Sequence, residues 1–196
     1  PVTIRSGSAV FEQQTMKLSF IRGVTAEQET SVMSGDSLYA LLNKDKHLEK
    51  GELRGNSYLR TMEPGHSAEV HSTNMDFNLD KDQILESAIA FEDVTARTLN
   101  ADSDVVLSGS NSAEVKFQAQ DKQSVLKQLD TTGRSVITMS APKSKANDKR
   151  AANKRLTADQ VKLFWRASGQ DLEKAEANGN AELFVDPIDR STDSDR

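Results

Sequence analysis

The sequence predicts an all-β, antiparallel fold made of repeated hairpin-like arms, and three observations support this prediction. The twelve residues from Leu48 and the twelve from Leu172 are identical at seven positions without a gap, which indicates a repeated unit. Apolar and polar residues alternate with period two, as in strands with one wet and one apolar face. Polar turn residues recur between these stretches. Because one unit cannot bury its apolar face alone, the units must stack into an elongated domain.

Five arms can be aligned, each with an outgoing strand, a polar turn and a returning strand. They span residues 8–28, 36–61, 72–98, 112–140 and 158–186. The turns are expected near residues 13–15, 43–46, 80–83, 120–123 and 167–170.

The outgoing strands of the last three arms show the clearest alternation. In residues 73–80 every second side chain is apolar, and the same holds for residues 113–120. Residues 161–166 follow the pattern except at Phe164. Each strand therefore places its apolar residues on one face of a sheet whose other face is wet. Apart from small alanines, the apolar side consists of Met75, Phe77, Leu79, Val115, Phe117, Val161, Leu163 and Trp165.

A sharp bend is expected at the same place in each returning strand. Four of these strands begin with a leucine, and glycine stands seven residues later in three of the four. Glycine, and Asn or Asp beside it, tolerates positive φ, which indicates a bulge or crease. A sheet creased in every arm closes into a V-shaped trough, while glycine that serves only tight packing is the alternative. The positions are Gly55, Glu92, Gly133 and Gly179, with Asn56, Asp93 and Asn180 beside them.

Composition excludes several classes of protein. The apolar fraction of 36% predicts a thin core. The net charge of −5 argues against nucleic acid as a partner. Without cysteine there is no disulfide or thiolate metal site, and no apolar run is long enough for a transmembrane helix. The chain starts at Pro1, so we expect either a removed targeting segment or an excised part of a longer protein.

No catalytic or metal-binding motif is found in the sequence. The three histidines, His47, His66 and His71, do not have the spacings that place two metal ligands on one face. Nucleophile elbows, phosphate-binding loops and dinucleotide fingerprints do not occur. We therefore expect a protein that is not an enzyme and needs no metal or cofactor.

Two polar segments interrupt or follow the arms. Residues 142–155 hold six basic residues and one acid, and we interpret them as a loop inserted in a domain that spans residues 1–186. This loop is either a solvated linker or a contact for phosphorylated headgroups or an acidic partner. Residues 187–196 form a polar tail that is expected to be disordered or a linker.

Two stretches resemble a known family. They are L-T-A-D-Q-V-K-L-F from Leu156 and G-Q-D-L-E-K-A-E-A-N-G-N from Gly169. Both are similar to the OstA-like family of periplasmic lipopolysaccharide-transport proteins of the LptA, LptC and LptD N-terminal type. The basic insertion departs from the family pattern, and the chain has no membrane anchor of the LptC type.

The resemblance implies an antiparallel β-jellyroll, open like a folded taco, whose apolar interior shields lipopolysaccharide acyl chains on the way to the outer membrane. It also implies end-to-end strand pairing with other jellyroll transport components. Self-association would use the same edges. The implied location is the periplasm, with the chain either free or held at a membrane by a segment outside this sequence.

The apolar side of the predicted strands has two interpretations: it is a plain core, or it lines a trough for acyl chains. If it lines a trough, we predict that its residues bind lipid. The main alternative is a β-repeat scaffold or filament-forming protein with a filled core. A carbohydrate-binding jellyroll would need a flat row of exposed aromatics, and aromatics make up only 5% of the chain. The predicted lipid-binding residues are Met75, Phe77, Leu79, Val115, Phe117, Val161, Leu163, Trp165, Leu183 and Val185.

Overall fold

The computed structural model describes residues 2–28, 30–63, 65–100, 104–120, 123–140, 152–167 and 172–187. These residues form fourteen strands of one antiparallel sheet, which confirms the predicted fold class. None of the described residues is helical, so this part of the chain has no helix that could cross a membrane. The strands are β1 (Thr3–Arg5), β2 (Ser8–Glu12), β3 (Lys17–Gln28), β4 (Ser31–Leu42), β5 (Leu48–Glu63), β6 (His66–Leu79), β7 (Leu85–Asn100), β8 (Asp104–Gln120), β9 (Gln123–Thr132), β10 (Ser135–Ser140), β11 (Ala152–Ala158), β12 (Gln160–Trp165), β13 (Leu172–Asn178) and β14 (Glu182–Pro187).

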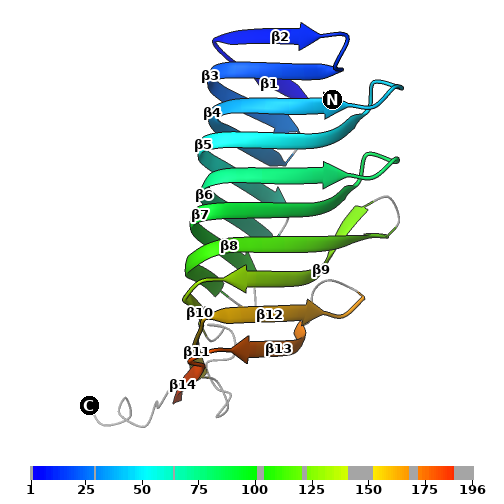
Figure 1. Ribbon diagram of the computed structural model, residues 1–196. Helices are drawn as coiled ribbons and strands as arrows, with labels where there is room; N and C mark the ends of the chain where they lie inside the picture. Colours follow the sequence, from blue (N-terminus) through cyan, green and yellow to red (C-terminus); the bar gives the residue numbers. More distant parts are fainter. Residues whose placement is uncertain are drawn as a thin grey trace, which may run out of the picture.

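The sheet folds over on itself, so that its strands stack into two walls (Figure 1). Strands β3 to β8 are long and run through both walls. The front wall is completed by β2 at one end and by β9, β12 and β13 at the other. The back wall is completed by β1 at one end and by β10, β11 and β14 at the other. Each wall therefore contains ten strands, with edge strands at both ends.

The crease between the walls lies where the sequence predicts it. The backbone has positive φ at Gly55 (71°), Glu92 (65°), Gly133 (80°) and Gly179 (72°). The pairing of β5 with β6 shifts register at this level, between Arg54 and Ser57, as expected for a bulge. A Cβ on Gly55 would collide with the Asp36 carboxylate, so glycine fits both the backbone angle and the space there. The same conformation recurs at Asn56, Asp93 and Asn180.

The sequence pattern missed part of the back wall. The returning strands of the predicted arms continue into this wall, but β4, β6 and β8 begin earlier than the arms predict, at Ser31, His66 and Asp104. In β4 and β6 the inner-facing residues change parity at the crease, from Met33 to Ala40 and from Val70 to Phe77, so the period-two pattern does not continue through the bend of these two strands. The turns predicted at 13–15, 43–46 and 80–83 are confirmed, and those at 120–123 and 167–170 lie partly outside the described residues.

The predicted basic loop is shorter than expected where the structure describes it. Residues 142–151 lie outside the described part, but residues 152–155 are not loop, because they begin strand β11. There Lys154 pairs with Met139 on one side and with Val185 on the other. The position of Lys154 is thus fixed by pairing with strands β10 and β14, which the composition of the sequence does not reveal. Likewise Pro187 ends β14, and residues 188–196 of the predicted tail lie outside the described part.

The core lies between the two walls. Both walls contribute to one cluster of buried side chains, with Leu53 and Met75 from the front wall and Val94 and Ile137 from the back wall. Buried serines and threonines sit close to the crease, where Ser110, Ser135 and Thr131 form a chain of hydrogen bonds. Their hydroxyls satisfy one another in the region where the strands change direction.

Candidate functional site: the apolar face between the walls

The inner face of the front wall carries a continuous apolar row. Residues paired across antiparallel strands point to the same face, so the register aligns their side chains. One such row, here called the front row, crosses all ten strands of the wall and contains a single residue without an apolar side chain, Gly51. The front row consists of Phe11, Leu18, Ala40, Gly51, Phe77, Ala88, Val115, Leu129, Leu163 and Ala175.

The inner face of the back wall carries a matching row. It also crosses ten strands, from β1 to β14, and every member is apolar. This back row consists of Ile4, Ala26, Met33, Leu59, Val70, Ala96, Leu107, Ile137, Leu156 and Leu183. Because both rows contribute to the buried cluster, the concave side of the folded sheet is apolar along its whole length.

Exposure on the front wall rises from the crease towards the hairpin turns. Next to the front row on the crease side, Leu53 and Met75 are 0% and 2% exposed. On the turn side, paired residues near the hairpin ends form what we call the mouth row, and all but one of them are half-buried. Between the edge strands the deep part of the front wall is thus closed, and apolar surface becomes accessible towards the mouth. The mouth row consists of Leu42, Leu48, Leu79, Leu85, Phe117, Leu126, Trp165 and the exposed Leu172.

All ten predicted lipid-binding residues lie on this inner face, but at different depths. Met75 and Val161 belong to the closed region beside the crease, and Phe77, Val115 and Leu163 lie in the front row. The mouth row contains Leu79, Phe117 and Trp165. The structure places Leu183 and Val185 apart from these eight, on edge strand β14 of the back wall, where they are 64% and 46% exposed.

Sequence reasoning missed the rest of the back row. Leu59, Val70 and Ile137 line the same interior from the opposite wall. The alternation in residues 135–140, with Ile137 and Met139 on the inner face, was the available signal. Alternation alone does not mark this stretch as a separate strand beyond a crease, because it continues directly from the returning strand of the predicted fourth arm.

Both ends of the apolar rows reach edge strands. At one end Ile4 and Phe11 are 37% and 47% exposed, and at the other Leu183 is 64% exposed. Strands β1, β2, β13 and β14 each pair with only one neighbour among the described strands, so each has a free backbone edge. Such edges are templates for pairing with another chain.

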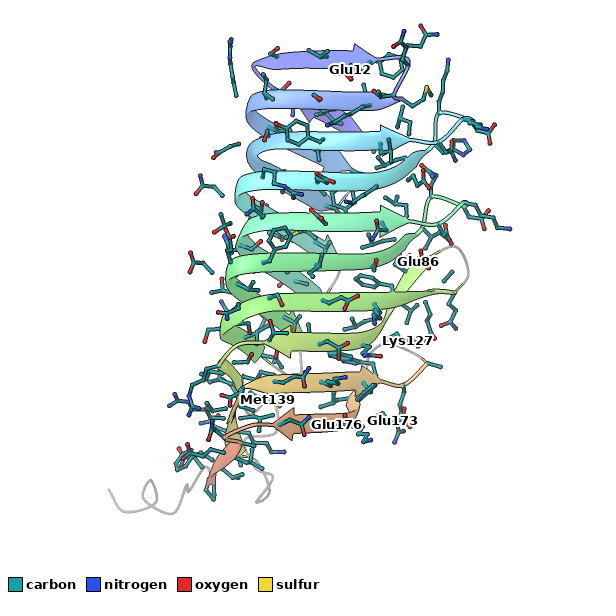
Figure 2. All side chains as sticks on the ribbon, in the orientation of Figure 1. Glu12, Glu86, Lys127, Met139, Glu173 and Glu176 are labelled. Atoms are coloured by element: carbon teal, nitrogen blue, oxygen red, sulfur yellow. The ribbon has the colours of Figure 1, made fainter. Side chains whose placement is uncertain are left out.

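The outer face of the front wall is charged and internally matched. Lys50 and Arg54 both contact Glu52 and Asp76. The hydrogen bond from Lys50 lowers the pKa of Glu52 and raises the pKa of Lys50 itself. A similar pair joins Lys174 to Glu176 of β13, which is labelled in Figure 2. This face is therefore suited to water, in contrast to the apolar concave side.

The back wall has its own ion pair on the outer side. Arg97 donates two hydrogen bonds to Asp104, at 2.9 and 2.8 Å, and thereby lowers the pKa of that carboxyl. A shallow hollow of about 220 Å³ lies beside this pair, lined in part by Arg60 and Met62. A second hollow of about 290 Å³ lies over the crease, beside His71 and Asp93. Both hollows are small and mixed in polarity.

The described residues contain no group of three His, Asp or Glu side chains placed to hold a metal ion. His71 stacks against Tyr58 with ring centroids 4.4 Å apart, and His47 lies in a hairpin turn, where its backbone N–H is bonded to Asn43. The side chain of His66 lies outside the described part. The apolar concave face is the only extended feature of the described chain that suggests a ligand class.

The chain was compared with protein-family models, curated proteins and solved structures. The chain matches no protein-family model and no curated protein sequence. It is similar to the crystal structure of LptH, the LptA-homologous periplasmic component of the lipopolysaccharide transport device of Pseudomonas aeruginosa. The match covers 95% of this chain and 96% of that chain, with 8% identity and a TM-score of 0.45.

Proposed function

We propose that this protein is a periplasmic lipid carrier whose concave apolar face shields the acyl chains of lipopolysaccharide, or of a similar glycolipid, during transport to the outer membrane. The observation that supports the proposal most strongly is the pair of apolar rows, each crossing ten strands. The motifs from Leu156 and Gly169 point to the same function through the family they resemble.

The physical basis is apolar burial without directional contacts. Covering apolar surface contributes about 25 cal/mol per Å², so the mouth row can hold a flexible chain without one decisive residue. Half-buried Leu79, Phe117 and Trp165 present such surface, while the deep region near Leu53 is already closed. The proposed contact therefore begins at the mouth row and involves Phe117 and Trp165 more than Met75 or Val161.

The free edges supply the proposed partner contacts. A second copy, or another jellyroll component, pairs with an edge strand at either end and continues both walls. Leu183 and Val185 on β14 then become inner residues of a longer trough. Lys154 and Arg155 of β11 do not belong to a free basic contact loop, because each is paired with a strand on both sides.

The test is site-specific photo-crosslinking with lipopolysaccharide. A photoreactive residue replaces Phe117 or Phe77 on the inner face, or Lys116 or Asn78 on the outer face, in otherwise identical proteins. We expect crosslinks to lipopolysaccharide at the inner positions, strongest at Phe117. Equal labelling at Lys116 and Asn78 would contradict an apolar binding face.

The second candidate is a scaffold with a filled interior. Its support is the closed deep region, in which Leu53, Ile137 and Val161 are 0%, 1% and 0% exposed. Binding of a fluorescent fatty acid separates the two functions, since a scaffold with a filled interior leaves the emission of the probe unchanged. Saturable binding that is competed by lipopolysaccharide supports the carrier.

A further inference from the structure

One residue of the front row differs from its neighbours in how it is accommodated. The ring of Phe77 lies directly over Gly51 on the neighbouring strand. A Cβ on Gly51 would collide with three ring atoms, Cζ, Cε1 and Cε2. Phe77 is 8% exposed, so the ring occupies, inside the trough, the space that a side chain on β5 would otherwise fill.

The neighbours of Phe77 within the front row are small. Within the front row, Ala40 precedes Gly51 and Ala88 follows Phe77. Across four adjacent strands, about 14 Å at the usual strand spacing, a single aromatic ring supplies nearly all of the side-chain volume. Further along the row this volume comes from Leu18 on one side and Val115 on the other. Ala40, Gly51 and Ala88 thus form a notch that only Phe77 fills.

The notch lies between a closed floor and an accessible mouth. On its crease side Leu53 and Met75 are 0% and 2% exposed. On its turn side Leu48 and Leu79 of the mouth row are half-buried. The ring of Phe77 is therefore the last movable layer that a guest meets before the rigid floor.

We propose that Phe77 is a displaceable plug that determines how deeply an acyl chain can enter the trough. A guest that passes the mouth row turns the ring out of the notch by a change of side-chain rotamer and occupies the space over Gly51. The displaced ring then covers the guest from the mouth side. This inference rests on the proposed carrier function and names its specificity-determining residue.

The lining of the notch also selects the chemistry of the guest. Ala40, Ala88 and the Gly51 backbone offer methyl groups and a main chain whose amides are paired with neighbouring strands. A hydroxyl group buried there would have no free partner, which is unfavourable. The notch therefore accepts a plain hydrocarbon segment in preference to a hydroxylated one.

Affinity for a fluorescent long-chain fatty acid tests the plug in four proteins. The wild type is compared with Phe77→Ala, with Gly51→Ala, and with Val24→Ala, which shortens a 2% exposed core residue that lies in neither row nor among the predicted lipid-binding residues. Phe77→Ala should bind at least about tenfold more tightly, because the guest no longer displaces a buried ring. Gly51→Ala should bind more weakly, since its methyl group occupies the notch and forces the ring towards the mouth. Val24→Ala should stay within about twofold of the wild type.

Two results would overturn the plug. One is the same change in affinity for Phe77→Ala and Val24→Ala, with binding by the wild type intact, which removes the plug but leaves the carrier function. The other is an absence of binding by the wild type as well as the variants, which removes both.

A measurement on the unsubstituted fold guards against variants that fail to fold. With 4-fluorophenylalanine placed at position 77 alone, fluorine NMR reports the ring environment during titration with the fatty acid. The resonance should shift and saturate together with binding. A resonance that stays unchanged at saturation contradicts the displacement of the ring.

Discussion

Glu92 stands at a crease position where three other strands have glycine. Its φ of 65° lies in the left-handed region, which costs a residue with a Cβ about 1–2 kcal/mol. The only described side-chain partner is Asn74, which donates a 3.2 Å hydrogen bond to the Glu92 carboxylate at an exposed site. The recurring glycines made the crease predictable from sequence. The depth of each side chain was not predictable, because it depends on the opposite wall.

We expect Glu92→Gly to stabilise the protein by up to about 1 kcal/mol, since relief of the backbone outweighs one exposed hydrogen bond. Urea denaturation of the variant and the wild type measures the difference. The matched control is Gly55→Ala, which should destabilise by about 1–2 kcal/mol because alanine collides with Asp36 at φ 71°. A loss of stability in Glu92→Gly would show that the contact with Asn74 matters more than the backbone angle.

The outer ion pairs predict a small dependence of stability on acid. The pKa of Glu52 is lowered in the folded protein, so its contribution is present above its ordinary value of 4.5 and is lost as the pH falls through the lower folded value. Because Glu52 is 36% exposed, the effect should stay below about 1 kcal/mol. Glu52→Gln should flatten the stability profile below about pH 5 in denaturation series. An unchanged profile would mean that solvent screens the pair with Lys50 completely.

Two front-wall hairpins use the same turn. In the hairpin of β4 and β5, the side-chain oxygen of Asn43 accepts hydrogen bonds from the backbone N–H groups of Asp45 and His47, both at 2.9 Å. In the hairpin of β6 and β7, Asp80 accepts from two backbone N–H groups in the same arrangement. The side chain of Gln83 from this second turn bonds both backbone groups of Leu48, which ties one hairpin to the next.

Asn43→Ala should destabilise the protein by about 1 kcal/mol, because two backbone N–H groups lose their acceptor at an exposed turn where water replaces it in part. Asn43→Asp, which keeps an oxygen in the same place, should cost less than half as much. Thermal and urea denaturation report both variants. Equal losses in the two variants would show that the turn does not depend on this acceptor.

At the scale of single elements, the sequence predicts some strands and turns and misses others. Alternation located the front-wall strands, and polar clusters located three described turns. The back-wall halves of β4 and β6 were not predicted, because the inner-facing residues change parity at the crease of these strands, from Met33 to Ala40 and from Val70 to Phe77. The start of β11 was hidden for a different reason, since the basic composition of residues 152–155 conceals pairing that only the folded neighbours provide.

The whole molecule is a stack in which each strand contacts mainly its sequence neighbours. Such an architecture lacks long-range crosslinks, so its stability is close to a sum of local terms and interfaces. The predicted apolar side was placed correctly on the inner face. Its division into a closed floor and an accessible mouth follows from the folding of one wall onto the other.

Hydrogen exchange should therefore show a gradient along the stack. We expect the backbone amides of β5 to β8, which have neighbours on both sides, to be the most protected, and those of β2, β13 and β14 to exchange fastest. Native-state exchange followed by mass spectrometry measures this. Uniform protection from end to end would indicate a fully cooperative unit instead.

The two apolar rows run to the edge strands without a terminating wall among the described residues. A hydrocarbon cargo held at the mouth row and moved by one strand spacing exchanges one large apolar neighbour, in most steps a leucine, for another, so its free energy changes little. A uniform binding free energy along the row permits one-dimensional diffusion of the cargo but gives it no preferred direction. Net flow would have to come from loading at one end and removal at the other.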